Sequence, residues 1–480
     1  MKKYFPYYLT TLFLLSTLSL LPTTTLSFAQ SGWGPDTRLV FMQGGGWYPR
    51  AACCGDTIHL VWYQRYSSVG PHEEVFYKRS TDAGVTWGED VMLSVEDGTT
   101  STFPIIACNG SKVYVFWLER NFGTLFRKST DGGTTWSSID STLQGAGYHD
   151  VYLLNDSIFL AGSRNPADIL FRKSTDGGIT WLPLQIVGYG CYESQAVNSP
   201  FIGCVYQVTR YCQEIMFKRS TDGGATWSDS MIVSHYDSLG SQGASIEVDT
   251  CISFHTVWYD YKYSPYAWTG DIFYRASRDS GNTWEEIDSL TVQHRAIASD
   301  ILAEGNNLHL VWEDDRNGFD DNFEIYYRMS TDLGRTWGPE ERLTNAPYKS
   351  ISPSLACGGG YLHLFWRDCR DSANNGIGFI YYKRKDLSIP ISEFDYQDDT
   401  SEFLTISPNP FKEKTLITFF LPDVSGILEI YDVCGRSVFK KEVSGKGRKE
   451  VLWQTDRVGV HFIQLRTIGK IIIKKVVAFR

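Results

Sequence analysis

An eight-residue pattern that occurs six times is the feature of this chain that most limits its possible folds. The first copy runs from Ser80 to Trp87, and its serine, aspartate, glycine, threonine and tryptophan recur in register in every copy. In such an octet the aspartate can accept backbone N–H groups further along the chain, and the glycine can adopt a positive φ at low cost. The octet therefore predicts a tight turn between two strands. The residues that we assign to this structural role are Ser80, Asp82, Gly84, Trp87, Asp131, Gly133, Trp136, Asp176, Gly178, Trp181, Asp222, Gly224, Trp227, Asp279, Gly281, Trp284, Asp332, Gly334 and Trp337.

The spacing of the octets predicts the architecture. Their tryptophans lie between 45 residues apart (Trp136 to Trp181) and 57 residues apart (Trp227 to Trp284). Each interval also contains an apolar strand that ends in tryptophan or an equivalent residue, such as 308–312. This period accommodates four short strands and is typical of a propeller blade. We therefore predict an all-β fold built around a β-propeller.

The number of central strands favours seven blades, although six remain possible. Seven such strands accompany the six octets, if weaker copies near 158–161 and 201–206 are included. The last unit lacks an octet, but the segment after Trp33 resembles the segment after Trp337. We expect the N-terminal segment to supply the outer strand of the last blade, because this closes the ring and removes an open sheet edge.

The octets resemble the Asp boxes, or BNR repeats, of the sialidase-like propellers, and the resemblance extends over about residues 33–384. We assign 30–390 to this domain. The resemblance implies that the octets lie at the periphery of the blades and stabilise the fold. It also implies that ligands bind near the central channel, at loops from several blades.

The sialidases of this superfamily imply a further test. They bind the sialate carboxylate with three arginines, and they use an aspartate as acid/base and a tyrosine activated by a glutamate as nucleophile. The first arginine belongs to an Arg-Ile-Pro motif, whereas this chain has Pro49-Arg50 in the reverse order. The loop before the first octet contains Glu73 and Glu74 but no aspartate. These departures favour a non-catalytic module that binds a glycan or a protein over a sialidase-like exo-glycoside hydrolase with a rearranged site.

Three segments offer candidate ligand contacts. Residues 259–268 contain five aromatic side chains, which could stack on sugars, anchor a protein or fill a long loop. Residues 312–321 and 366–371 combine carboxylates with arginines, which suits acid/base chemistry, a calcium loop or local ion pairs. Calcium has no further support, and we expect no metal or cofactor. The candidate ligand-face residues are Arg50, Tyr259, Tyr266, Trp268, Asp315, Arg316 and Arg367.

A sialidase-like site would require three arginines to converge beside a tyrosine–glutamate pair in one central pocket. The sequence leaves open whether they do. The arginines available for this are Arg50, Arg120, Arg164, Arg210, Arg295, Arg316 and Arg367.

The net charge excludes one class of partner, and the N-terminus indicates export. The formal net charge of −10 argues against nucleic-acid binding. Residues 1–29 are typical of a signal peptide, with Lys2 and Lys3 before an apolar stretch and small residues near Ala29. We expect no membrane span after cleavage.

Of ten cysteines, we expect most to be packed thiols, including Cys53, Cys108 and Cys357. The residues most suited to disulfides are Cys191, Cys204, Cys212 and Cys251.

A second, smaller domain is predicted at the C-terminus. After an acidic linker at 391–404, residues 405–480 show alternating apolar residues typical of a short Ig-like β-sandwich. This ending resembles the C-terminal sorting domains of type IX secretion cargo. The resemblance implies recognition by the translocon and a location outside the cell or on the outer-membrane surface of a Gram-negative-type bacterium. The alternative is an accessory sandwich with no role in export. The residues that carry the resemblance are Pro408, Asn409, Pro410, Gly435, Arg436 and Gly459.

Overall fold

The computed structural model describes most of the chain after the predicted signal peptide. The described residues are 32–41, 44–66, 72–144, 147–164, 168–208, 213–237, 239–264, 269–293, 295–317, 322–371, 377–387, 404–421, 425–432, 437–455, 459–467 and 470–478. They form strands, turns and loops, and they contain no helix. The chain is therefore all-β, as predicted.

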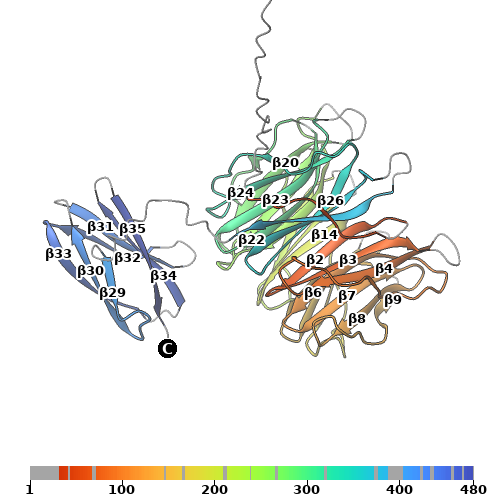
Figure 1. Ribbon diagram of the computed structural model, residues 1–480, viewed down its shortest axis with the longest axis horizontal. Helices are drawn as coiled ribbons and strands as arrows, with labels where there is room; N and C mark the ends of the chain where they lie inside the picture. Colours follow the sequence, from red (N-terminus) through yellow and green to blue (C-terminus); the bar gives the residue numbers. More distant parts are fainter. Residues whose placement is uncertain are drawn as a thin grey trace, which may run out of the picture.

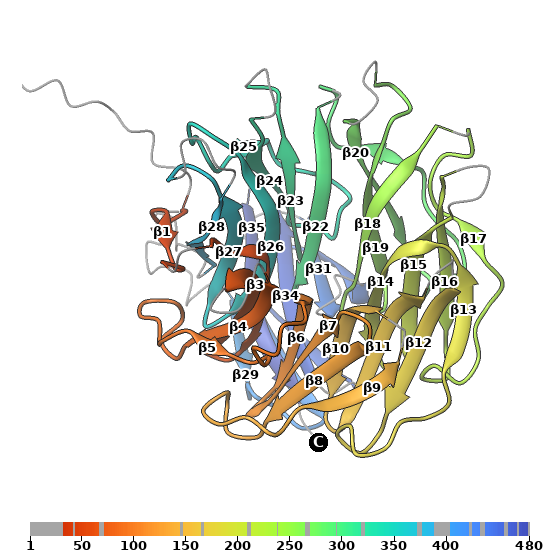
Figure 2. The same cartoon turned by 90° about the vertical axis from the view of Figure 1, so that its right-hand side faces the viewer.

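Seven antiparallel sheets of four strands each form the first part of the structure, one after another along the chain (Figure 2). The first three are β2 (Trp47–Cys54), β3 (Thr57–Tyr66), β4 (His72–Ser80) and β5 (Val91–Met92); β6 (Ser101–Asn109), β7 (Lys112–Glu119), β8 (Gly123–Ser129) and β9 (Asp140–Gln144); and β10 (Gly147–Leu154), β11 (Ser157–Arg164), β12 (Asp168–Ser174) and β13 (Gln185–Tyr189). We call them blades 1 to 3.

Blades 4 to 6 follow the same order. They are β14 (Cys191–Asn198), β15 (Phe201–Gln207), β16 (Ile215–Ser220) and β17 (Met231–Ile232); β18 (Ser241–Val248), β19 (Phe254–Asp260), β20 (Asp271–Ser277) and β21 (Asp288–Ser289); and β22 (Ala296–Glu304), β23 (Asn307–Asp314), β24 (Glu324–Ser330) and β25 (Glu341–Arg342). The first strand of each blade contacts the first strand of the next, and β26 contacts β2, so the seven inner strands form a closed ring.

Blade 7 joins the two ends of the propeller. It contains β26 (Ser350–Gly358), β27 (Tyr361–Asp368) and β28 (Phe379–Asp386), and its outer strand is β1 (Thr37–Arg38) from the N-terminal segment. In this pairing Thr37 lies opposite Tyr382, and Trp33 forms a further bridge with Lys385. The prediction of seven blades and of closure by the N-terminal segment is confirmed.

Each octet forms a compact turn between the third and fourth strands of a blade. In the first copy, Ser80 Oγ donates a hydrogen bond to Asp82 Oδ1 at 2.7 Å and accepts one from the backbone N–H of Gly84 at 2.9 Å. Asp82 Oδ1 accepts the backbone N–H of Thr86 at 2.8 Å. The Thr86 hydroxyl also donates to Asp82 Oδ2 at 2.6 Å. This bond has the largest effect, and together with the others it lowers the pKa of Asp82 to about 2. The aspartate therefore organises the turn as a carboxylate.

The octet glycine also lies against the preceding blade. A Cβ on Gly133 would overlap the hydroxyl of Tyr77 in blade 1, and Gly84 lies in the same way against Tyr382 of blade 7. The octet tryptophan packs on the same aromatic ring, since Trp136 meets Tyr77 edge-on with centroids 4.9 Å apart. The octets therefore stabilise the contacts between blades as well as the turns.

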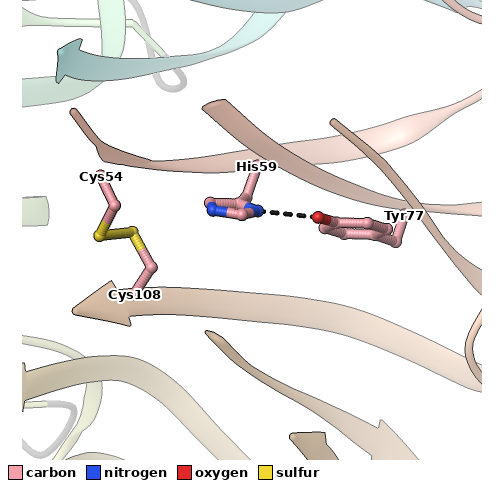
Figure 3. Close-up of a disulfide and its surroundings, with 4 residues drawn as sticks. All are labelled: Cys54, His59, Tyr77 and Cys108. Carbon is pink, nitrogen blue, oxygen red and sulfur yellow. Dashed lines mark hydrogen bonds between the residues drawn. A yellow bond between two sulfur atoms is a disulfide. The ribbon is translucent and has the colours of Figure 1, made fainter. Parts of the chain in front are cut away.

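Four of these tyrosines share a buried hydrogen bond with a histidine of the central strand. His59 Nδ1 lies 2.8 Å from Tyr77 Oη in blade 1 (Figure 3). Burial is the main cause that lowers the pKa of His59 to about 4, so the ring is neutral at physiological pH. The equivalent pairs in blades 5, 6 and 7 are His255–Tyr274, His309–Tyr327 and His363–Tyr382.

The cysteine predictions need correction. Cys108 is not a packed thiol: it forms a disulfide with Cys54, and this bond joins β2 to β6 with a Cα–Cα distance of 6.3 Å (Figure 3). The reason is that the inner strands of adjacent blades converge, so their ends meet. Cys191 and Cys204 are free thiols, since both lie within blade 4 opposite Gln207 and Gln195. The remaining predicted cysteines are Cys53 and Cys357, which are free thiols, Cys251, which is disulfide-bonded, and Cys212, which lies outside the described residues.

The C-terminal domain consists of two further sheets (Figure 1). One contains β29 (Leu404–Ser407), β30 (Lys414–Leu421) and β33 (Gly447–Gln454); the other contains β31 (Ser425–Asp432), β32 (Ser437–Ser444), β34 (Gly459–Thr467) and β35 (Lys470–Ala478). Both contribute to one buried cluster, in which Trp453 of the first sheet packs with Leu428 and Ile463 of the second and with Phe411 from the segment between β29 and β30. This is a β-sandwich. Gly435 and Arg436 lie outside the described residues.

Candidate functional site: the central cavity

All seven inner strands contain a β-bulge near their first residues. The register shifts lie between 47 and 50, 102 and 105, 148 and 150, 191 and 194, 242 and 245, 297 and 299, and 351 and 354. In five of the bulges one residue has a positive φ; these residues are Tyr48, Phe103, Gly243, Ala298 and Ser352. A bulge bends a strand and redirects a side chain, and bulges are frequent beside functional sites. Because the bulges recur in all seven inner strands, they mark the end of the propeller at which these strands begin.

A cavity of about 970 Å³ lies between the inner strands at this end and is lined by residues from all seven. Small side chains such as Ala51, Ala244 and Ser299 leave the space open. Its volume is within the range of ligand-binding sites. The cavity is therefore the candidate functional site.

Carboxyl groups dominate the ionisable side chains of the cavity. Its lining includes Asp150, Glu193, Glu247, Asp300 and Glu313, whereas Arg50 is the one lining arginine or lysine among the described residues. Burial by the cavity walls is the main cause that raises the pKa of Asp150 to about 6, of Glu193 to about 7 and of Glu247 to about 8. Part of the negative charge is thus neutralised by protons at physiological pH.

Some of these carboxyl groups join neighbouring blades. Asp150 of blade 3 accepts the backbone N–H of Gln195 in blade 4 at 2.8 Å. Asp300 of blade 6 accepts the backbone N–H of Leu355 in blade 7 at 2.9 Å. Such bonds position the inner strands, so Asp150 and Asp300 have a structural contribution in addition to any contact with a ligand.

Blade 4 presents a different set of groups. Neither carboxylate oxygen of Glu193 has a hydrogen-bond partner on another described residue, and the side-chain oxygens of Gln195 and Gln207 also lack one. All three side chains line the cavity, with exposures of 5%, 6% and 4%. We call these residues the acceptor group.

An aromatic group lies at blades 1 and 2 beside the cavity. Tyr48 stacks on Tyr63 with centroids 5.9 Å apart, and Phe103 meets Tyr48 edge-on at 5.3 Å. Tyr48 lines the cavity and is 41% exposed, and Phe103 is 44% exposed. We call Tyr48, Tyr63 and Phe103 the aromatic group. It offers flat apolar surface directly next to buried polar groups.

The structure places the predicted ligand-face residues in different surroundings. Arg50 and Tyr259 line the cavity, and Tyr259 Oη donates to Gln242 Oε1 at 2.9 Å. The guanidinium of Arg367 lies 3.4 Å over the ring of Trp47, next to the cavity lining. Tyr266 and Trp268 lie outside the described residues.

Asp315 and Arg316 belong to a local ion-pair network. Arg316 Nε donates to Asp314 Oδ1 at 2.8 Å, and its Nη1 donates to Glu340 at 2.6 Å. Asp315 pairs with Arg295 at 3.4 Å. In the part of the chain that the structure describes, no cluster of three or more His, Cys, Asp or Glu side chains could hold a metal ion. This segment therefore has the geometry of a hairpin with local ion pairs.

Three arginines do not meet in the cavity within the described residues. Arg50 lines it, whereas Arg164 pairs with Asp168 at 2.6 Å and Arg316 with the carboxylates beside it. Arg120 and Arg295 are not among its lining residues, and Arg210 lies outside the described residues.

Sequence reasoning missed Asp150, Glu193, Glu247 and Asp300. The sequence signal for them is an acidic residue within the first strand of four successive units, β10, β14, β18 and β22. The bulges shift the alternation of side chains along these strands, so a simple period of two does not show which residues face the axis.

The C-terminal domain carries a recognisable signature. Residues 405–478 match the secretion system C-terminal sorting domain. The chain therefore carries such a domain at its C-terminus, which indicates a secreted or cell-surface protein. Among the described residues, no helix is long and apolar enough to cross a membrane.

Solved structures that are similar to this chain include a polysaccharide lyase and a trans-sialidase. An ulvan lyase, a polysaccharide lyase, superposes with a TM-score of 0.51 at 11% identity, over 72% of this chain and 95% of that chain. An intramolecular trans-sialidase from Ruminococcus gnavus has a TM-score of 0.42 at 13% identity, over 73% and 97%. At 11% identity, the superposition with the ulvan lyase shows a shared fold alone. No curated protein is similar to the chain in sequence.

Proposed function

We propose that this chain is an exported recognition protein whose propeller binds a glycan in the central cavity. The observation that carries the proposal is the cavity itself, where exposed aromatic rings adjoin buried hydrogen-bonding groups. The rings of Tyr48 and Phe103 can stack on the apolar faces of sugars, and the polar lining can bind hydroxyl groups. A binding role requires no catalytic group.

The charge of the cavity supports a ligand other than sialic acid. Binding a sialate carboxylate by the sialidase scheme requires several arginines, and Arg50 is the one that lines the cavity among the described residues. The carboxyl groups of Asp150, Glu193, Glu247 and Asp300 would repel an anion in their ionised forms. These groups favour a neutral or cationic ligand.

Export by the type IX route is part of the proposal. The C-terminal sorting domain supports recognition by that translocon. The predicted signal peptide at 1–29 would provide the first export step, across the inner membrane. A location at the cell surface would give the propeller access to extracellular glycans.

A glycoside hydrolase is the second candidate. The observation that favours it is the set of carboxyl groups with raised pKa values, because Asp150 and Glu247 could act as a general acid. The two roles differ in the fate of the glycan: a recognition protein releases it unchanged, whereas a hydrolase cleaves it.

The test is a glycan array probed with the purified full chain. We expect binding to a limited set of glycans, and loss of that binding in Tyr48→Ala. The matched control is Phe420→Ala, which removes a similarly exposed ring (44%) from the C-terminal domain. Equal loss in both variants, or no binding to any glycan, would contradict the proposal.

A further inference from the structure

We propose that the blade 4 side of the cavity binds a primary ammonium group, and that the ligand is a glycan containing amino sugars with free amines. This inference rests on the proposed function and names its ligand class. It depends on the acceptor group, Glu193, Gln195 and Gln207.

The acceptor group gathers buried acceptor oxygens on β14 and β15 that receive no hydrogen bond from another described residue. Glu193 contributes two oxygens, and Gln195 and Gln207 contribute one each. The great majority of buried polar groups in proteins are hydrogen-bonded, because leaving a buried group unpaired is destabilising. A ligand that supplies several donors at this place would satisfy them together.

The side-chain amide of Gln195 is fixed in this orientation. Its Nε2 donates to the backbone oxygen of Phe159 in blade 3 at 2.9 Å, so its oxygen is the atom left to accept. Its backbone N–H donates to Asp150 Oδ2 at 2.8 Å, which holds the strand in place. The acceptor is therefore preorganised before any ligand arrives.

An ammonium group matches this set better than a hydroxyl or a metal ion. It carries three N–H donors and no acceptor, whereas a sugar hydroxyl carries one donor. The cavity lining adds Asp150, Glu247, Asp300 and Glu313 to Glu193 against one arginine among the described residues, and those carboxyl groups that are ionised attract a cation. Among the described residues no three ligands are arranged to hold a metal ion.

The aromatic group indicates that the amine is attached to a sugar. Tyr48 presents an exposed ring in the cavity lining, Phe103 extends this surface by packing edge-on against Tyr48, and sugar rings pack on such faces through their C–H groups. A glycan with free amines uses both features at once, because its rings cover the aromatic group while its ammonium reaches the acceptor group.

Calorimetric titration of the purified full chain with glucosamine oligosaccharides tests the inference. N-acetylglucosamine oligosaccharides of the same length are the comparison, because acetylation removes the charge and two donors. We expect the glucosamine oligomers to bind at least about 10-fold more tightly, which corresponds to about 1.4 kcal/mol. Glu193→Gln, which keeps the shape of the side chain, should remove that preference.

Two further variants separate binding from folding. Gln207→Met removes an acceptor while keeping an unbranched side chain, and should also weaken the binding of glucosamine oligomers. Glu74→Gln is the matched control: Glu74 is fully buried in β4, accepts a hydrogen bond from Ser94 and is not a cavity-lining residue. It should bind like the wild type.

The outcomes distinguish the two proposals. Equal affinity for both sugar series would overturn the ammonium site and leave glycan binding in place. Equal binding of oligolysine and glucosamine oligomers would overturn the assignment to a glycan. If neither sugar series binds, this inference is wrong, and the glycan array decides the proposed function separately.

Discussion

Trp33 lies edge-on against Tyr327, with ring centroids 5.3 Å apart and ring planes at 86°. This contact repeats the one between an octet tryptophan and the aromatic ring of the preceding blade, as in Trp337 and Tyr274 at 5.2 Å and 75°. Blade 7 has no octet, so the N-terminal segment supplies its tryptophan together with its outer strand. The ring is thus closed by a side chain that is far from its partners in sequence.

Replacing Trp33 with alanine should destabilise the propeller strongly. Trp33 is 8% exposed, and loss of a buried tryptophan costs about 3–5 kcal/mol. Phe41→Ala is the control, because Phe41 is 70% exposed. Denaturant unfolding gives both values. A loss in Trp33→Ala no larger than in Phe41→Ala would show that closure does not depend on this contact.

Two adjacent glycines of one octet separate backbone strain from packing. Gly132 and Gly133 have φ values of 67° and 78°, so an alanine at either costs about 1–2 kcal/mol. A Cβ at 133 would also overlap Tyr77 Oη, whereas one at 132 would only approach Arg79. We expect Gly133→Ala to lose about 1–3 kcal/mol more than Gly132→Ala in thermal or denaturant unfolding. Equal losses would refute the packing role.

The disulfide between Cys54 and Cys108 should stabilise the contact between blades 1 and 2. The two cysteines are 54 residues apart in sequence, and a bond that closes a loop of this size contributes about 2–4 kcal/mol. The double variant Cys54→Ala/Cys108→Ala should lose this amount of stability in denaturant unfolding. Reductant should lower the stability of the wild type further than that of the variant; equal sensitivity would contradict the assignment.

Glu247 should make stability fall as pH rises. Burial first, and then the charges of Asp300 and Asp150, raise its pKa to about 8 in the folded protein. The pKa of a glutamate in the unfolded chain is about 4.3, so at pH values between the two pKa values the folded state holds a proton that the unfolded state has lost. This stabilisation is complete below the unfolded pKa and is lost as pH rises through about 8.

The check is the free energy of unfolding of wild type and Glu247→Gln at about pH 5 and about pH 9. Glutamine does not titrate, so the wild type should lose more stability than the variant over this interval. Parallel pH profiles would mean that the cavity does not raise the pKa of Glu247.

The propeller and its closure could be predicted because they depend on local chemistry that repeats. The octet uses a Ser, an Asp and a Gly within one turn, and the segment after Trp33 resembles the one after Trp337. Both signals survive in a single sequence because neither depends on the packing of distant strands.

The cavity could not be predicted in the same way. Its facing residues are set by bulges, and a shift of one residue turns a side chain from one face of a strand to the other. Glu193 lies within such a bulge, between Cys191 and Ser194. The disulfide from Cys54 to Cys108 was missed because it depends on how closely two inner strands converge.

The most direct test of the central claim is to incubate the full chain with the strongest glycan from the array, and to analyse binding and products by mass spectrometry. The account predicts a complex in which the glycan stays intact after prolonged incubation, and in which Tyr48→Ala abolishes the complex. Cleavage of the glycan by the wild type, with loss of turnover in Glu247→Gln, would contradict a recognition role and identify an enzyme.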